Sequence, residues 1–378
     1  MFLIERLLGV SIYMLVLVFV YFLLVKSKIS YRSILRFYLI CLCCMAFFYK
    51  PYKTADLYRI FEQMDYFSPM EFSVFWEKFI LGSSIPLSRL LFWFFGKIGC
   101  NELLSVFSAL FCYTLIFYVI KKTKELYDIS NKTVATVLFF IMSTSMYISV
   151  IGGIRMMIAL SMLSFSFFRI TVEKRIKIID VLFFIASVLM HTMSVAAIGI
   201  MAVTFLFNLR KNTLKKIGNF FILALIGYVF VVRFSNTAQE VFDKFLEYIL
   251  GDKHSDPWEY LMGALIIILL FFVFAEFRSI RGTGACKELN KYNMAAVFCV
   301  ALAICFCFEF SIFYRFGGHL AVMFSIPSMM VTLDRTPEKS KIFFKGMDFQ
   351  TIVILCSCII AVISCARGSL SSLKFFVL

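Results

Sequence analysis

Residues 133–168 read TVATVLFFIMSTSMYISVIGGIRMMIALSMLSFSFF, and this stretch decides the class of fold. It contains two apolar segments, 133–151 and 154–168, separated by Gly152-Gly153, and its one charged residue is Arg155. A helix needs about 20 mostly apolar residues to cross a bilayer. The first segment has nearly that length, and the second is short enough that tilt or mismatch is expected. The stretch therefore predicts two consecutive membrane spans joined by a glycine turn.

The composition of the whole chain agrees with this interpretation. Of 378 residues, 62% are hydrophobic and 16% are charged, whereas soluble domains are about 45–50% apolar and about 25% charged. That excess excludes a soluble enzyme, a nucleic-acid-binding protein and a secreted disulfide scaffold. Most of the 12 cysteines lie within apolar segments, where they act as small hydrophobic residues, and neither Cys-x-Cys pair has a histidine at zinc-ligand spacing.

The same hydropathy argument extends along the chain. It predicts an all-α polytopic integral membrane protein of about 12 transmembrane helices, folded as a single multi-span domain over residues 1–378. The predicted spans are 7–25, 34–49, 103–120, 133–151, 154–168, 178–192, 194–209, 217–233, 260–277, 294–312, 316–333 and 349–366.

Basic residues indicate the orientation of these spans. Six alternate connections carry four Lys or Arg each, and together they account for the net charge of +15. Because Lys and Arg gather on the cytoplasmic side, both termini and the long loops 50–102 and 234–258 are expected outside. If the apolar stretch 86–99 crossed the membrane, every later basic connection would lie on the outer side. We therefore expect it to form a re-entrant or interfacial helix within the first outer loop.

Unusual polar residues collect at the predicted outer edge of the membrane. Each has a structural explanation of its own: Arg155 could reach the headgroups, His191 could stabilise a turn, Glu309 could pair with Arg315, and Asp56 could cap a helix. Their convergence at one depth favours a functional site instead. The full set is Asp56, Tyr58, Arg59, Arg155, His191, Glu309, Arg315 and His319.

These side chains suit an anionic ligand. Guanidinium groups bind phosphate with two hydrogen bonds and can neutralise a departing pyrophosphate, and a His or Asp can accept a proton from an attacking hydroxyl. No Asp-x-Asp metal motif stands near the outer edge, and no Walker loop, dinucleotide glycine pattern or serine-hydrolase elbow is present. The sequence therefore predicts chemistry with no metal and no cofactor, stabilised by arginine.

Four short motifs resemble the Wzy-type and EpsG-like polymerases of bacterial surface polysaccharides. They are Ile151-Gly152-Gly153-Ile154-Arg155-Met156-Met157-Ile158-Ala159, Leu189-Met190-His191-Thr192, Thr54-Ala55-Asp56-Leu57-Tyr58 and Tyr314-Arg315-Phe316. The chain departs from the family pattern at Met156, where a polar residue is usual, and at Ile85-Pro86, where Glu-Pro is frequent. The serine expected two residues after the histidine is displaced to Ser194.

The resemblance implies a GT-C-like, metal-independent glycosyltransferase in the bacterial cytoplasmic (inner) membrane, with its active site facing the periplasm or exterior. It would join undecaprenyl-pyrophosphate-linked oligosaccharide repeat units for O-antigen, capsule or exopolysaccharide, with polyprenyl pyrophosphate as the leaving group. Arg155 and Arg315 would bind the pyrophosphate, and His191 or Asp56 would act as the base. A chain-length co-polymerase and a flippase are implied as partners.

The remaining outer residues receive supporting roles. Tyr58, Arg59, Glu309 and His319 are candidates for sugar binding or support. Trp76, Trp93 and Trp258 could stack on sugars, although anchoring in the aromatic belt of the membrane explains all three equally simply.

Three alternative functions stay open from the sequence. A flippase or other transporter would carry charges at mid-membrane and related halves, but Asp180 is the one candidate for such a charge and no halves match. A membrane acyltransferase would use a histidine but needs paired arginines less. A structural subunit of an assembly complex is the third alternative.

Overall fold

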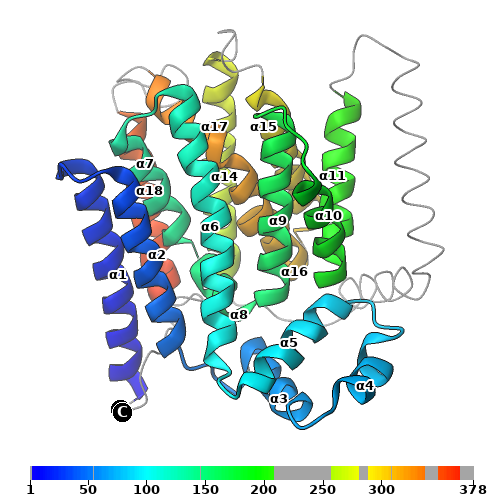
Figure 1. Ribbon diagram of the computed structural model, residues 1–378. Coiled ribbons are helices and arrows are strands. Elements are labelled where there is room, and N and C mark those ends of the chain that lie inside the picture. Colours follow the sequence, from blue (N-terminus) through cyan, green and yellow to red (C-terminus); the bar gives the residue numbers. More distant parts are fainter. Residues whose placement is uncertain are drawn as a thin grey trace.

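The computed structural model is an all-helical bundle in the part of the chain that it describes, residues 2–53, 55–144, 146–207, 257–280, 288–307, 309–336 and 348–366. Long helices run up and down side by side, and several short helices cover one end of the bundle (Figure 1). The core is apolar and continuous across both halves of the chain. The prediction of an all-α polytopic membrane protein is confirmed.

The helices follow the apolar segments of the sequence closely. Their bounds are α1 Phe2–Lys26, α2 Tyr31–Phe48, α3 Asp56–Phe67, α4 Phe72–Phe75, η1 Trp76–Ile80, α5 Pro86–Ile98, α6 Glu102–Tyr127, α7 Asn131–Ser143, α8 Met146–Gly152, α9 Ile154–Thr171, α10 Ile178–Met190, α11 Met193–Phe207, α14 Pro257–Ile280, α15 Leu289–Cys305, α16 Phe310–Phe313, η3 Tyr314–Ala321, α17 Val322–Arg335 and α18 Phe349–Ala366.

Six of the described helices are long and apolar enough to cross a membrane, and α7 with α8 forms a seventh if a pair bent by 59° counts as one span. Four more, α10, α11, α15 and α18, are apolar but shorter. The boundary predicted between spans 294–312 and 316–333 is wrong, because α15 ends at Cys305 and the next helical segment begins at Phe310. The predicted span 217–233 and most of loop 234–258 lie outside the described residues.

Between α2 and α6 the chain folds into short helices at one end of the bundle (Figure 1). Helix α3 buries Leu57, Ile60 and Met64 along one face, which gives it an amphipathic pattern. Helix α5 packs against it so closely that a Cβ on Gly96 would lie 2.6 Å from the carbonyl oxygen of Met64. Helix α5 is too short to be a candidate span, as the sequence predicted for residues 86–99.

The connections between α1 and α2, α6 and α7, and α9 and α10 lie at the other end (Figure 1). At this end of the bundle, neighbouring groups compensate the charge of Asp180. Its side chain is fully buried, lies 3.0 Å from the guanidinium of Arg169 and accepts a hydrogen bond from the backbone N–H of Lys177 at 2.8 Å. Asp180 therefore fastens the start of α10 to the end of α9.

Candidate functional site

Arg155 stands on the first turn of α9, as the sequence predicted. Helix α8 ends at Gly152, Gly153 precedes α9, and the N–H of Gly153 donates to the carbonyl oxygen of Ser149 at 2.7 Å. A Cβ on Gly153 would lie 3.0 Å from that same oxygen. This close approach favours glycine at the junction between α8 and α9, just before the half-buried Arg155.

Arg315 and His319 stand on a π-helical turn, η3, which continues directly into α17. A π turn bonds residue i to i+5 and is frequent at functional sites. The turn fits against the bundle because it carries two glycines, and a Cβ on Gly317 would lie 3.0 Å from the side chain of Ile267. The charge of Arg315 acts on the imidazole of His319, so these two residues lie close together, as their spacing of four predicted.

A hydrogen bond joins these two regions. The hydroxyl of Ser149 on α8 lies 3.1 Å from Nε2 of His319 on η3, 170 residues away in the sequence. His319 is only 2% exposed, its ring packs edge-on against Tyr314 at 4.7 Å, and its Nδ1 has no hydrogen-bond partner among the described residues. The structure thus connects the turn that carries Arg155 to the turn that carries Arg315.

Sequence reasoning did not identify Ser149. A single serine within an apolar helix is usually bonded to its own backbone, and only the three-dimensional packing places it against His319. The one signal in the sequence was that Ser149 lies four residues before Gly153. That spacing indicates that the two backbones approach closely, but it does not identify His319 as the partner of the hydroxyl.

His191 ends α10 and holds a fixed orientation. It has an extended backbone, its Nδ1 accepts a hydrogen bond from the N–H of Met193 at 3.1 Å, and the hydroxyl of Ser194 donates to the carbonyl oxygen of Ser187 at 2.8 Å. Since Nδ1 acts as the acceptor, the neutral ring carries its proton on Nε2. In this tautomer Nε2 carries the N–H donor of the ring.

Asp56 lies on the first turn of α3, but it is not the cap that the sequence predicted. The N-cap is Ala55, without a side-chain hydrogen bond. The carboxylate of Asp56 lies 3.6 Å from Arg59, and both side chains are about two-thirds exposed, at 67% and 65%. Tyr58 is half-buried on the same helix. Helix α3 contacts α8, so this exposed pair belongs to the same end of the bundle as the glycine turn.

Glu309 lies just before α16 and is buried at 6% exposure. Its carbonyl oxygen accepts the N–H groups of Ile312 and Phe313 at the start of that helix. Helix α14 packs against the same turn, because Gly263 leaves room for the ring of Phe313. Glu309 therefore stands in a closely packed corner directly ahead of Arg315.

The three tryptophans differ in their surroundings. Trp93 stacks on Phe75 at 5.6 Å and donates from Nε1 to the carbonyl oxygen of Met70 at 3.2 Å, so it holds the short helices together. Trp76 and Trp258 are 41% and 43% exposed, which leaves part of each ring available to a ligand or to the membrane interface.

An apolar groove of about 440 Å³ lies between the short helices and the bundle. It is bounded by α5, α6, α9 and α10 and has an entirely apolar lining. Ile158 and Met162, which line it, follow Arg155 by three and seven residues on one face of α9. Met190, which also lines it, directly precedes His191. Residues that line the groove therefore lie within two helical turns of Arg155 on α9 and directly before His191 in the sequence.

Comparison with known families matches the EpsG family over residues 58–375. The chain belongs to the EpsG family. Membership in the EpsG family points to a polysaccharide polymerase and confirms the resemblance found in the sequence. The EpsG match contains Arg155, His191, Arg315 and His319, whereas Asp56 precedes it. No curated protein and no solved structure matches the chain.

Within the described ranges, no three His, Cys, Asp or Glu side chains are grouped so that they could hold a metal ion.

Proposed function

We propose that this protein joins oligosaccharide repeat units carried on undecaprenyl pyrophosphate. The hydrogen bond between Ser149 and His319 supports this proposal most directly, because it ties the turn bearing Arg155 to the turn bearing Arg315. Two guanidinium groups on connected turns suit the two phosphates of a pyrophosphate. Membership in the EpsG family supplies the reaction class, polysaccharide polymerisation.

In the proposed reaction, the growing chain is the donor and the next lipid-linked unit is the acceptor. A sugar hydroxyl of the acceptor attacks the anomeric carbon of the donor, the new glycosidic bond forms, and the bond from that carbon to the pyrophosphate oxygen breaks. The hydroxyl proton passes to a base, and the electron pair leaves with the polyprenyl pyrophosphate. Arg155 and Arg315 stabilise the charge on this leaving group, so no metal is required.

The base is His191 or Asp56, and the two have different local geometry. His191 presents a donor at Nε2 while Met193 occupies Nδ1, which favours hydrogen bonding to a phosphate or sugar oxygen. Asp56 has an exposed carboxylate, which accepts hydrogen bonds and lies 3.6 Å from Arg59. We therefore assign proton removal to Asp56 and orientation of the substrate to His191, with Tyr58, Arg59, Glu309 and His319 in support.

The apolar groove beside Arg155 supports a lipid-linked substrate. Its lining of aliphatic and aromatic side chains suits a prenyl tail, and two of the lining residues, Ile158 and Met162, follow Arg155 on α9. The short helices α3 to α5 at this end would hold the sugars. The basic connections at the opposite end favour a cytoplasmic location for that end, which supports a reaction at the outer face of the inner membrane.

The test is an alanine scan of Arg155, His191, Arg315 and Asp56 in the native host, scored by the ladder of surface polymer on gels. We expect Arg155→Ala and Arg315→Ala to abolish long polymer while protein levels stay normal. Lys53→Ala is the control, since it removes an exposed cation from the same end that has no role in the proposed site. Normal ladders from all four variants would overturn the proposal.

A flippase is the competing assignment, and a deletion strain separates the two. Loss of a polymerase leaves single repeat units on the outer face, whereas loss of a flippase traps lipid-linked units inside. The same strain, examined for cross-linking or co-purification, tests the proposed partnership with a flippase and a chain-length co-polymerase.

A further inference from the structure

A second groove lies at the opposite end of the bundle, on the seam between α2 and α6. It encloses about 230 Å³ and is lined by residues 32 to 39 of α2 and 114 to 121 of α6. The lining positions recur at spacings of three and four on both helices, so each helix contributes one continuous face. The two helices run in opposite directions (Figure 1), which brings the start of α2 beside the end of α6.

The groove has one cationic end and one apolar end. Arg32, Arg36 and Lys121 line it near the basic connections. One turn further into the bundle its walls are Leu35, Leu39 and Phe117. The change from charged to apolar lining follows the direction of the helices, from the end of the bundle toward its middle.

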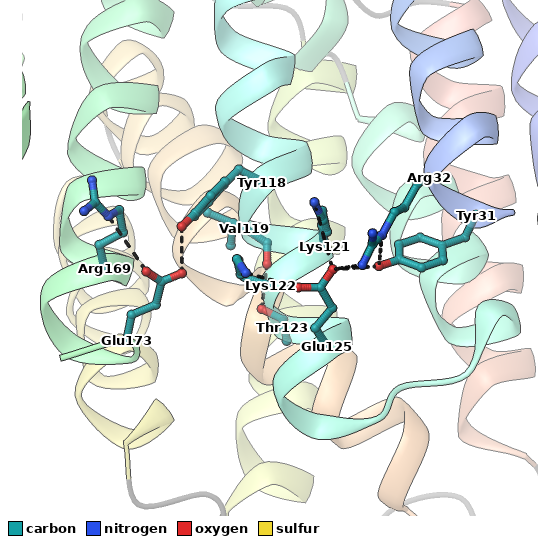
Figure 2. A network of polar contacts seen from close by, with 10 residues as sticks. All are labelled: Tyr31, Arg32, Tyr118, Val119, Lys121, Lys122, Thr123, Glu125, Arg169 and Glu173. Carbon is teal, nitrogen blue, oxygen red and sulfur yellow. Dashed lines mark hydrogen bonds and ion pairs between the residues drawn. The ribbon is translucent and has the colours of Figure 1, made fainter. Parts of the chain in front are cut away.

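Positive charge is in excess at the cationic end. A single carboxylate, Glu125, serves three cations, at 2.8 Å from Arg32, 3.2 Å from Lys122 and 4.0 Å from Lys121. Figure 2 shows this group gathered around Glu125, with Tyr31 also donating to the carboxylate at 3.1 Å. Arg36 is exposed and makes no ion pair within the described ranges.

We propose that this groove binds an anionic phospholipid of the surrounding membrane. Its phosphate would lie between Arg36 and Lys121, and the first part of an acyl chain would lie along Leu39 and Phe117. Charge complementarity selects this ligand, because a cationic pocket between helices that continues into an apolar wall matches the headgroup and chain of a phospholipid. The site is remote from Arg155 and does not depend on the proposed polymerase activity.

The ion pair between Arg32 and Glu125 prepares the site. It holds the start of α2 against the end of α6, and Lys122 and Tyr31 occupy further positions around the same carboxylate. A phosphate would engage Arg36 and Lys121. Arg36 makes no ion pair within the described ranges, and Lys121 lies 4.0 Å from Glu125.

The test uses native mass spectrometry of the purified full-length protein titrated with dioleoyl phosphatidylglycerol and dioleoyl phosphatidylcholine. The wild type should bind phosphatidylglycerol more tightly. The double variant R36Q/K121Q should bind it roughly thirtyfold more weakly, about fivefold for each cation near the membrane surface, with unchanged binding of phosphatidylcholine.

Two further variants control for net charge and for the cavity. K78Q/K97Q removes two exposed cations from the short helices at the other end and should bind phosphatidylglycerol as the wild type does. Thr114→Phe fills the apolar end without changing charge and should weaken binding of phosphatidylglycerol. The proposal is overturned if R36Q/K121Q stays within about twofold of wild type, if K78Q/K97Q loses as much, or if Thr114→Phe has no effect.

Discussion

Replacing Ser149 by alanine should uncouple the two arginine-bearing turns. The variant removes the hydroxyl that lies 3.1 Å from Nε2 of His319 and leaves the rest of α8 unchanged. His319 is 2% exposed and its Nδ1 already has no partner in the described part of the chain. Both ring nitrogens would then be buried without a hydrogen bond.

The size of the effect follows from that burial. A buried polar group that loses its partner costs about 1–3 kcal/mol, which corresponds to a factor of at least about five in an equilibrium between the connected and the separated turns. Thermal unfolding in detergent should show the loss of stability. Polymer formation in cells should fall at least about fivefold if both arginines must face one pyrophosphate.

Ser143→Ala is the matched control for this measurement. Ser143 is fully buried in the neighbouring helix α7, but its hydroxyl donates only to the carbonyl oxygen of Phe139 one turn earlier, at 2.7 Å. Ser149→Thr keeps a hydroxyl and should restore most of the activity. If Ser149→Ala and Ser143→Ala are equal in both stability and polymer ladder, the coupling is not what positions the arginines.

Three other buried features give further expectations. Asp180→Asn should lower the free energy of unfolding by about 3 kcal/mol, because it leaves Arg169 buried without its closest carboxylate; the double replacement of both residues by apolar ones should recover stability, as measured by thermal melting. Gly263→Ala should cost about 1–3 kcal/mol, since its Cβ would lie 2.3 Å from the ring of Phe313, and Phe313→Leu in the same chain should relieve it. Gly96→Ala should separate α5 from α3, detectable as faster proteolysis between these helices, while retention of wild-type protection would contradict the packing argument.

The sequence predicted most helices correctly because apolar length is the main determinant of a membrane span. Helix α18 coincides with the predicted segment 349–366, and α9 begins where the glycine turn indicated. The prediction that residues 86–99 form a short helix at one end also holds. Charge distribution was sufficient for this, since a third crossing at that point would have reversed all later connections.

Hydropathy could not locate the break between α15 and α16. Phe306 and Cys307 are apolar, so a window average continues across them, although the helix ends at Cys305. The π turn of Tyr314–Ala321 was likewise not predicted, because i→i+5 bonding depends on how the turn packs against α14 and α15. Only the pair Gly317-Gly318 marks it in the sequence.

The sequence supplied the candidate residues of the site as a hypothesis, but it did not supply the contacts between them. Sequence spacing placed Arg315 near His319 and Arg155 on a first turn, because both are local properties of helices. The bond from Ser149 to His319 spans 170 residues and arises only from tertiary packing. Local sequence rules did not place the cap of α3 correctly. The N-cap is Ala55, and the carboxylate of Asp56 pairs with Arg59 instead.

The π turn also determines the spacing between Arg315 and His319, which both lie on it. An α-helix advances about 100° for each residue, and a π turn holds one residue more per hydrogen-bonded ring than an α turn does. Deleting a single residue between Phe316 and Gly318 would turn η3 into ordinary α-helix. Arg315 would then stand three residues before His319 instead of four, a spacing that keeps both side chains on one helical face.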